Sequence, residues 1–219
     1  MELFSYLLGK KSGGGGGGGA DLSDYFQPTI DSHGVLPMVK NIPDTTIVEG
    51  TDLTSAFHAY KGTTIPLLDT SNVLVMTSMF SNCPNLITIP LLNTSKVNNM
   101  TTMFLDCSSL KSIPLLDTSS VLAINMSSMF SGCTNLETVP VLNTSNITSM
   151  NNMFAGCTSL SDASLDNILQ MCINSKVTMQ SRKKLSNVGL TAENYPVSKI
   201  QALPHYQGFI DAGWIIGYE

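Results

Sequence analysis

Charged side chains are scarce in this sequence, and no strongly basic stretch stands out among them. Asp, Glu, Lys and Arg together make up 12% of the 219 residues, and the formal net charge is -5. The densest positive cluster, Arg182-Lys183-Lys184, is only three residues long. Binding to nucleic acid needs a basic face that neutralises many phosphates. We therefore expect no nucleic-acid partner and interpret the cluster as a solvated turn.

Long apolar runs are also lacking. A bilayer-spanning helix needs about 20 consecutive apolar residues, and no run in the sequence approaches that length, so we expect no membrane insertion. Residues 1–8 have an acid, Glu2, where a signal peptide needs a basic region, and Lys10 and Lys11 follow the apolar part. We expect no recognisable signal peptide.

Patterns typical of metal sites and of catalysis are missing. The sequence has no Cys-x-x-Cys pair, and its three histidines, His33, His58 and His205, are scattered. No spacing pairs the acidic and histidine residues of the tail as a catalytic acid and base; these residues are Asp162, Asp166, Glu193, His205 and Asp211. We expect no metal, no cofactor and no catalytic residues, and predict that the protein is not an enzyme.

One sequence motif occurs four times between residues 65 and 160. Each copy holds an Ile-Pro or Val-Pro pair, an Asx-Thr-Ser triplet, a Met-Phe pair and a cysteine. The prolines recur at intervals of 24, 24 and 26 residues, at Pro66, Pro90, Pro114 and Pro140. A fixed period of this length, with apolar residues at fixed phases, is typical of stacked coils. We predict a four-repeat, β-rich solenoid over residues 65–160.

Each copy can be divided into short elements. Residues 86–91 have the composition of a strand, with a proline near its end, and residues 97–100 predict a second short strand. The Asx residue of each triplet is expected to turn the chain by bonding the backbone two residues on. Spacing at i, i+3, i+4 and i+7 predicts one or two buried helical turns at Met100, Met103, Phe104 and Cys107. The third copy has two extra residues, which predict a bulge near residues 122–124.

Four cysteines share one phase of the repeat. They are Cys83, Cys107, Cys133 and Cys157. Coils about 4.8 Å apart would bring neighbouring cysteines within disulfide range. A core phase fits all four positions, and cysteine packs as a small apolar residue, so we interpret them as free, buried thiols.

The sequence before the repeats has three parts. Residues 1–11 predict a detached anchor peptide, whose candidate contact residues are Leu3, Phe4, Tyr6, Leu7 and Leu8. Residues 12–19 contain seven consecutive glycines, which predict a flexible linker; a polyglycine helix packed in a homo-oligomer is the alternative. Residues 20–64 predict a lead-in and a degraded capping repeat, because residues 53–57 overlay residues 76–80 and Tyr60 takes the cysteine phase.

The tail, residues 161–219, predicts a mainly helical C-terminal cap. Asp162 can cap a helix in which Leu165, Ile168, Leu169 and Cys172 share one face. Residues 191–195 predict a short helix stopped by Pro196, and residues 204–212 predict another that ends before Gly213. We interpret Trp214, the single tryptophan, as a core residue.

Positions that vary between the four copies are expected to face outward. Three such files are Ile87, Lys111, Glu137 and Ser161; Asn72, Lys96, Ser120 and Asn146; and Ser81, Leu105, Ser131 and Ala155. Lys111 and Glu137 form either a charge pair between neighbouring coils or part of a contact surface. We predict a binding strip made of Thr88, Ser112 and Thr138 with Ile87, Lys111 and Glu137.

The repeated motif resembles the BspA-like leucine-rich repeats of bacterial surface proteins. It reads Leu-Asx-Thr-Ser-x-Val followed by Met-x-x-Met-Phe-x-x-Cys-x-x-Leu. The match covers residues 65–160, with a degraded extension back to residue 42. The resemblance implies a right-handed solenoid of the leucine-rich-repeat type and roles in adhesion or protein binding, with no catalytic residues. The N-terminal peptide with its polyglycine run, and the Gly-Trp and Gly-Tyr pairs near the end, are more similar to phage or prophage structural proteins that carry such repeats.

Two functional hypotheses follow. The first is a binding module on a phage virion or an extracellular bacterial surface, which recognises a host protein or a glycan through the outer face of the coils. The second is a structural or decoration component that docks to phage proteins through its N-terminal peptide and has no ligand of its own.

Overall fold

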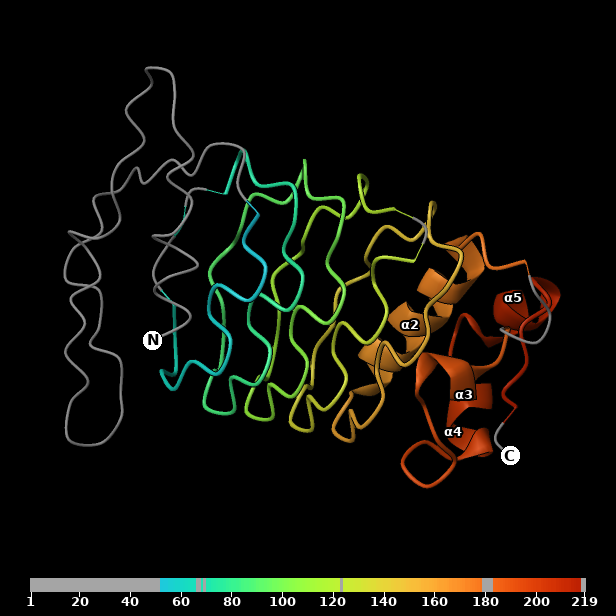
Figure 1. Cartoon of the computed structure of the whole chain (residues 1–219). Coiled ribbons are helices and arrows are strands. Elements are labelled where there is room, and N and C mark those ends of the chain that lie inside the picture. The colour runs from blue at the N-terminus through green and yellow to red at the C-terminus, as the bar shows by residue number, and fades with distance from the viewer. Residues whose placement is uncertain (1–51, 66–67, 69, 123, 179–182, 218–219) are drawn as a thin grey trace, which may run out of the picture.

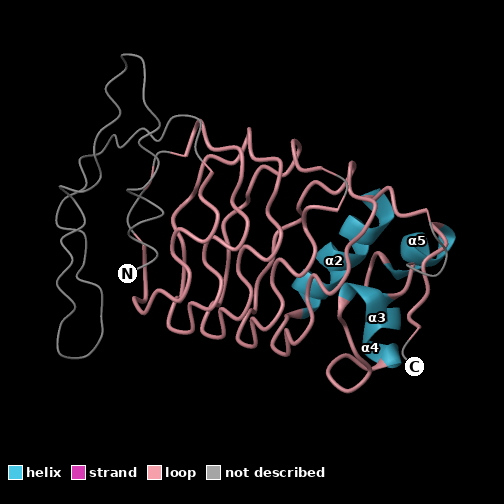
Figure 2. Ribbon diagram, in the orientation of Figure 1, coloured by secondary structure: helices cyan, strands magenta, loops and turns pink. Residues whose placement is uncertain are grey.

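The computed structural model describes residues 52–65, 68, 70–122, 124–178 and 183–217. Over these residues the repeated part of the chain winds into coils that lie side by side, and the helices gather beyond the last coil (Figures 1 and 2). The predicted anchor peptide, the polyglycine linker and the lead-in as far as residue 51 lie outside the described residues. The assignment to a right-handed solenoid of the leucine-rich-repeat type stays a prediction.

Backbone hydrogen bonds join each coil to the next at a constant phase. At the phenylalanine phase, the N–H donates to a carbonyl of the following coil at 2.8–2.9 Å; the donors are Phe57, Phe80, Phe104 and Phe130, and the acceptors are Met79, Met103, Met129 and Met153. Because the same phase is bonded in coil after coil, side chains of one phase form straight files through the core.

The phenylalanine rings form the largest of these files. Phe57, Phe80, Phe104, Phe130 and Phe154 stack with successive ring centroids 5.4–5.6 Å apart. The four rings from Phe80 onward are completely buried. Such aromatic contacts contribute about 0.5–1.5 kcal/mol each beyond the area they bury. The overlay of residues 53–57 on residues 76–80 is confirmed, because Phe57 continues the file.

The cysteines form a second internal file. Each thiol donates to the phenylalanine carbonyl of the preceding coil: Cys83 to Phe57 at 3.0 Å, Cys107 to Phe80 at 3.0 Å, Cys133 to Phe104 at 3.1 Å and Cys157 to Phe130 at 3.2 Å. All five cysteines of the chain are free and buried. This confirms the interpretation as buried thiols, whose S–H groups satisfy carbonyls between the coils.

Burial of these thiols predicts a loss of stability in alkali. Burial raises the pKa of Cys157 from 9.0 to about 12, and burial also raises the pKa of Cys172. A thiol whose folded-state pKa is raised holds its proton while the unfolded chain releases one. The stability it contributes is therefore complete below pH 9 and is lost as the pH rises toward 12.

We expect the urea midpoint of unfolding to be constant from pH 7 to about pH 8.5 and to fall steadily above pH 9. The double variant Cys157→Ala, Cys172→Ala is the control, and its fall with pH should be shallower. Equal pH dependence of the variant and the natural chain would contradict this account.

The Met-Phe segment is buried as predicted, but it is not helical. Met100, Met103, Phe104 and Cys107 are all completely buried. The residue before each Met-Phe pair has a φ of 52–54°, which a right-handed helix excludes; these residues are Ser78, Thr102, Ser128 and Asn152. The segment is a series of tight turns, in which the Met79 N–H donates to the Met76 carbonyl at 3.3 Å.

The predicted short strands are also absent from the described residues, and shorter backbone bridges between coils take their place. In the residues that the structure describes, no strand forms, and the β-type pairing between neighbouring coils consists of isolated parallel bridges, including Val75 with Asn99 and Ser112 with Thr138. The proline and the Asx turn of each copy interrupt any longer ladder. The Asx turns themselves are confirmed: the Asn93, Asp117 and Asn143 side chains each accept from the backbone two residues on, at 2.9–3.2 Å.

Helix α2 (Asp162–Asn174) begins the C-terminal cap, by which we mean residues 161–178 and 183–217. Its N-cap is Ser161, whose hydroxyl accepts from the Ser164 N–H at 3.2 Å. The prediction that Asp162 caps the helix is therefore wrong by one residue. Ser161 has extended backbone, whereas Asp162 is already helical. The predicted face is confirmed, since Leu165, Ile168, Leu169 and Cys172 are completely buried.

Helix α3 (Leu185–Val188) takes the place of a further coil. The N–H groups of Asn152 and Phe154 donate to the carbonyls of Asn187 and Val188 at 2.7 and 2.9 Å. These are the same phases that bond one coil to the next elsewhere in the stack. The cap therefore satisfies donors that the last coil would otherwise leave open.

The remaining helices complete the cap. Helix α4 (Val197–Gln201) begins after Pro196, its N-cap, so the predicted helix at residues 191–195 is wrong; the φ of Pro196, -60°, suits a helix start. Helix α5 (Tyr206–Asp211) lies within the predicted residues 204–212. The core interpretation of Trp214 is confirmed, because it is 2% exposed and contacts Phe209.

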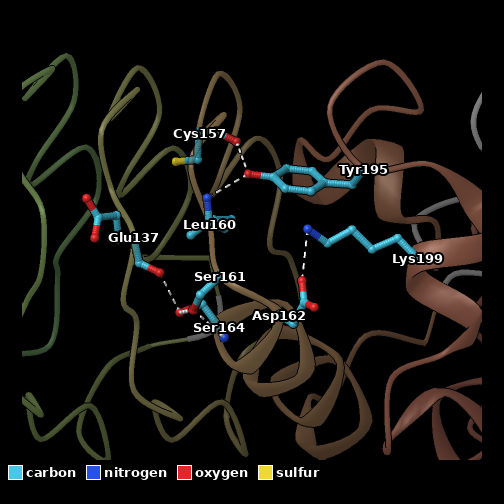
Figure 3. Close-up of polar contacts among 8 residues, drawn as sticks. All are labelled: Glu137, Cys157, Leu160, Ser161, Asp162, Ser164, Tyr195 and Lys199. Carbon is cyan, nitrogen blue, oxygen red and sulfur yellow. Dashed lines mark hydrogen bonds and ion pairs between the residues drawn. The ribbon is translucent and has the colours of Figure 1, made fainter.

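Side chains fasten the cap to the last coil (Figure 3). The buried Tyr195 hydroxyl donates to the Cys157 carbonyl at 2.7 Å and accepts from the Leu160 N–H at 2.9 Å. Lys199 of α4 pairs with Asp162 of α2 at 2.8 Å. In the part of the chain described here, no helix has the length and apolar character needed to cross a bilayer.

Candidate binding face

The predicted strip runs across neighbouring coils on the outer side of the stack. The Lys111 N–H donates to the Ile87 carbonyl at 3.1 Å, and the Glu137 N–H donates to the Lys111 carbonyl at 2.9 Å. Ser112 and Thr138 form a parallel bridge. Five of the six predicted residues are exposed and Ser112 is half-buried. We call this set the polar strip: Thr88, Ser112 and Thr138 with Ile87, Lys111 and Glu137.

The two charges of the polar strip are not paired with each other. In the described part of the chain, no ion pair within 4.0 Å joins Lys111 to Glu137. Both side chains are exposed, although the coils that carry them are adjacent. Of the two alternatives left by the sequence, a contact surface therefore fits this geometry better than a charge pair between neighbouring coils.

A second exposed file lies four residues further along each coil. Leu91, Leu115 and Val141, each following a proline, are 65%, 62% and 38% exposed. We call these three residues the apolar ridge. Sequence reasoning missed them, because positions that stay apolar in every copy were assigned to the core. The preceding proline was a usable signal, since it lacks an N–H donor and prevents regular strand pairing there.

The polar strip and the apolar ridge share one stretch of each coil. Where the second copy leads into the third, Leu110, Ile113 and Leu116 are buried. Lys111 and Leu115, which lie between them in sequence, are exposed. The two files are thus parallel rows on the outer side of the coils. We call them together the binding face. Large exposed apolar rows bordered by polar residues are typical of interaction sites.

The other two files that were predicted to face outward are less accessible to a ligand. Asn72 accepts from Lys96 at 2.7 Å, and Asn146 donates to the Ser119 carbonyl at 3.1 Å, so these polar groups are used between coils. The prediction that Ser81 faces outward is wrong, because Ser81 is 3% exposed. Its position lies within the tight turns, where neighbouring coils are close.

The structure brings together two tail residues that the sequence did not pair. Asp166 of α2 accepts from His205 twice, from the backbone N–H at 2.8 Å and at ring Nδ1 at 2.7 Å. An aspartate that orients a histidine occurs in catalytic triads. Here one carboxylate holds both the ring and the backbone at the start of α5, which is the arrangement of a clamp between two helices. The sequence gave no signal for this contact, because Asp166 on α2 and His205 just before α5 are 39 residues apart.

No cluster of three or more metal-ligating side chains occurs among the described residues. The polar groups of the binding face are two charges, hydroxyls and backbone amides. This chemistry suits recognition of another surface by contact, with hydrogen bonds at its border.

Comparisons with known proteins give a likeness among solved structures and a family match. No curated protein matches the chain. Among solved structures, a leucine-rich repeat protein from Eubacterium ventriosum is 22% identical, with a TM-score of 0.39. That match covers 49% of this chain and only 28% of the other, so the chain spans much less than the full length of that protein.

The family evidence is broader than the structural likeness. The model of the family described as "Mycoplasma protein of unknown function, DUF285" matches residues 51–168, from the first described coil into α2. This span contains all four repeats, the polar strip and the apolar ridge, and it is more than half of the chain. The chain therefore belongs to the DUF285 family.

Proposed function

We propose that this protein is a non-catalytic binding module, displayed on a bacterial surface or on a phage particle, that uses its binding face to hold another macromolecule. The observation that carries the proposal is the apolar ridge beside the polar strip. Three large side chains stay exposed in register, next to two charges that have no partner on the same chain within the described residues. An exposed row of apolar side chains adds nothing to the stability of the fold, because its apolar area is not removed from water.

The chemistry of the face favours a host-surface protein or a glycan as its ligand. Branched apolar side chains in a row can cover apolar side chains or the C–H faces of sugars. Lys111, Glu137 and the hydroxyls of Thr88 and Thr138 can form the hydrogen bonds at the border of the contact. Assembly through Leu3, Phe4, Tyr6, Leu7 and Leu8 is the alternative, in which the coils are a decoration without a ligand.

Replacement of the apolar ridge tests this function. The triple variant Leu91→Ser, Leu115→Ser, Val141→Ser should bind bacterial cells or a glycan array at least about tenfold more weakly, because apolar contact in the centre of an interface is lost. Binding of the full-length labelled chain is the measurement. Folding should be preserved, since the three side chains are already exposed.

The matched control replaces exposed apolar residues outside the face. Leu74→Ser with Leu122→Ser changes side chains that are 45% and 59% exposed and should leave binding unchanged. Equal binding by the triple variant and the natural chain would overturn the proposed face. Deletion of residues 1–19 tests the alternative: loss of incorporation into particles, with no binding by the natural chain, would favour decoration.

A further inference from the structure

We infer that the binding face pairs with the same face of a second copy of this chain. The inference rests on the proposed function, because it uses the same binding face, and a second copy would compete with a host ligand for that face. It is carried by the order of charges in the polar strip and by the equal offset between the polar strip and the apolar ridge.

The charges make the polar strip complementary to itself. Lys111 and Glu137 occupy the same phase on adjacent coils, whose backbones are joined by the 2.9 Å hydrogen bond from the Glu137 N–H to the Lys111 carbonyl. Two copies can be placed face to face by a two-fold axis that runs along the coils and passes between these two. Lys111 of each copy then lies opposite Glu137 of the other, so one geometry forms two charge pairs.

The apolar ridge meets itself in that same arrangement. Leu115 lies four residues after Lys111, and Val141 lies four residues after Glu137. A rotation that exchanges the two coils and keeps their direction places Leu115 opposite Val141 of the second copy, twice. Apolar contact and charge pairing are thus satisfied by one symmetry operation, without a change in register.

The charge balance of the chain allows this association. The formal net charge of -5 opposes self-association, but the charged residues of the binding face are one Lys and one Glu and cancel. Repulsion between charges elsewhere on the two copies is reduced beyond about 8 Å at physiological salt. A pair held by a few apolar contacts and two exposed charge pairs belongs to the small, weak class of interfaces, so dissociation in the micromolar range is expected.

Sedimentation of the full chain tests the inference. The natural chain should approach twice its 23.5 kDa mass as its concentration rises through the micromolar range. Lys111→Glu alone, or Glu137→Lys alone, should weaken association at least about tenfold, because each creates like-charge contacts in both symmetric positions. A mixture of these two variants should associate again, since each then supplies the charge that the other lacks.

The mixture separates contact between copies from pairing within one chain. If Lys111 and Glu137 instead form a charge pair within one chain, mixing the two variants does not restore association. Leu115→Ser should also dissociate the pair, whereas Leu122→Ser should not. A natural chain that stays monomeric, or a mixture that stays monomeric, overturns the inference. Neither result bears on the proposed host-surface function, because that function is tested by the cell-binding assay with the triple variant of the apolar ridge.

Discussion

Gly189→Ala should destabilise the protein by about 3 kcal/mol or more, an effect in the range of severe single substitutions. Gly189 is the C-cap of α3 and has a φ of 101°, where a side chain is strained. A Cβ there would lie 2.3 Å from the Ala155 nitrogen and 2.6 Å from its Cα. These are backbone atoms of the last coil, so no side chain can move aside. The cap would have to shift away from the stack.

Urea unfolding and hydrogen exchange together measure this effect. The amides of Asn152 and Phe154 should lose protection from hydrogen exchange first, because their acceptors are the Asn187 and Val188 carbonyls of α3. Gly156→Ala is the matched control. Gly156 has a φ of 74°, but the nearest atom to its Cβ would lie 3.5 Å away, so backbone strain of about 1–2 kcal/mol is the expected cost. Equal losses in the two variants would contradict the close approach.

Phe104→Ala should remove about 3–5 kcal/mol of stability. Phe104 is completely buried, and its ring stacks between Phe80 at 5.4 Å and Phe130 at 5.6 Å. In a stack of coils each unit is stabilised by its neighbours. A cavity at Phe104 therefore weakens two coil-to-coil contacts at once, and we expect the loss to appear in a single shift of the urea midpoint.

The end of the same file provides the control for Phe104→Ala. Phe57 is only partly buried and, among the described residues, stacks in the file on Phe80 alone, so Phe57→Ala should cost clearly less than Phe104→Ala. Phe104→Leu, which keeps much of the volume, should cost about 1.5 kcal/mol or less. A cost at Phe57 as large as at Phe104 would show that the file does not act through neighbouring coils.

Several parts of the fold could be predicted because a repeat fixes which side chains stack. The cysteine phase was assigned to the core on spacing alone, and the thiols are buried in one file. The overlay of residues 53–57 on residues 76–80 depended only on the order of residue types, and Phe57 continues the ring file. The Asx turns needed only local chemistry, two residues in length.

Other parts could not be predicted, because they depend on which segments lie against each other. Tight turns bury residues at i, i+3, i+4 and i+7 much as a helix does, and spacing alone did not reveal the positive φ of Ser78 and Thr102. The apolar ridge was missed because repetition shows that a position is apolar but not which side of the coil it occupies. Asp166 and His205 meet only after α2 and α5 have packed.

The sequence by itself determined the period, the residues that form the internal files and the absence of long apolar or basic stretches. Each of these is a property of spacing along the chain. The tertiary structure decided that the coils are joined by turns and isolated bridges and that the cap completes the last coil. It also decided that Leu91, Leu115 and Val141 stay in water, on the same coils as two charges that have no ion-pair partner among the described residues. The reason is that burial depends on what covers a side chain, and the cover is supplied by residues far away in sequence.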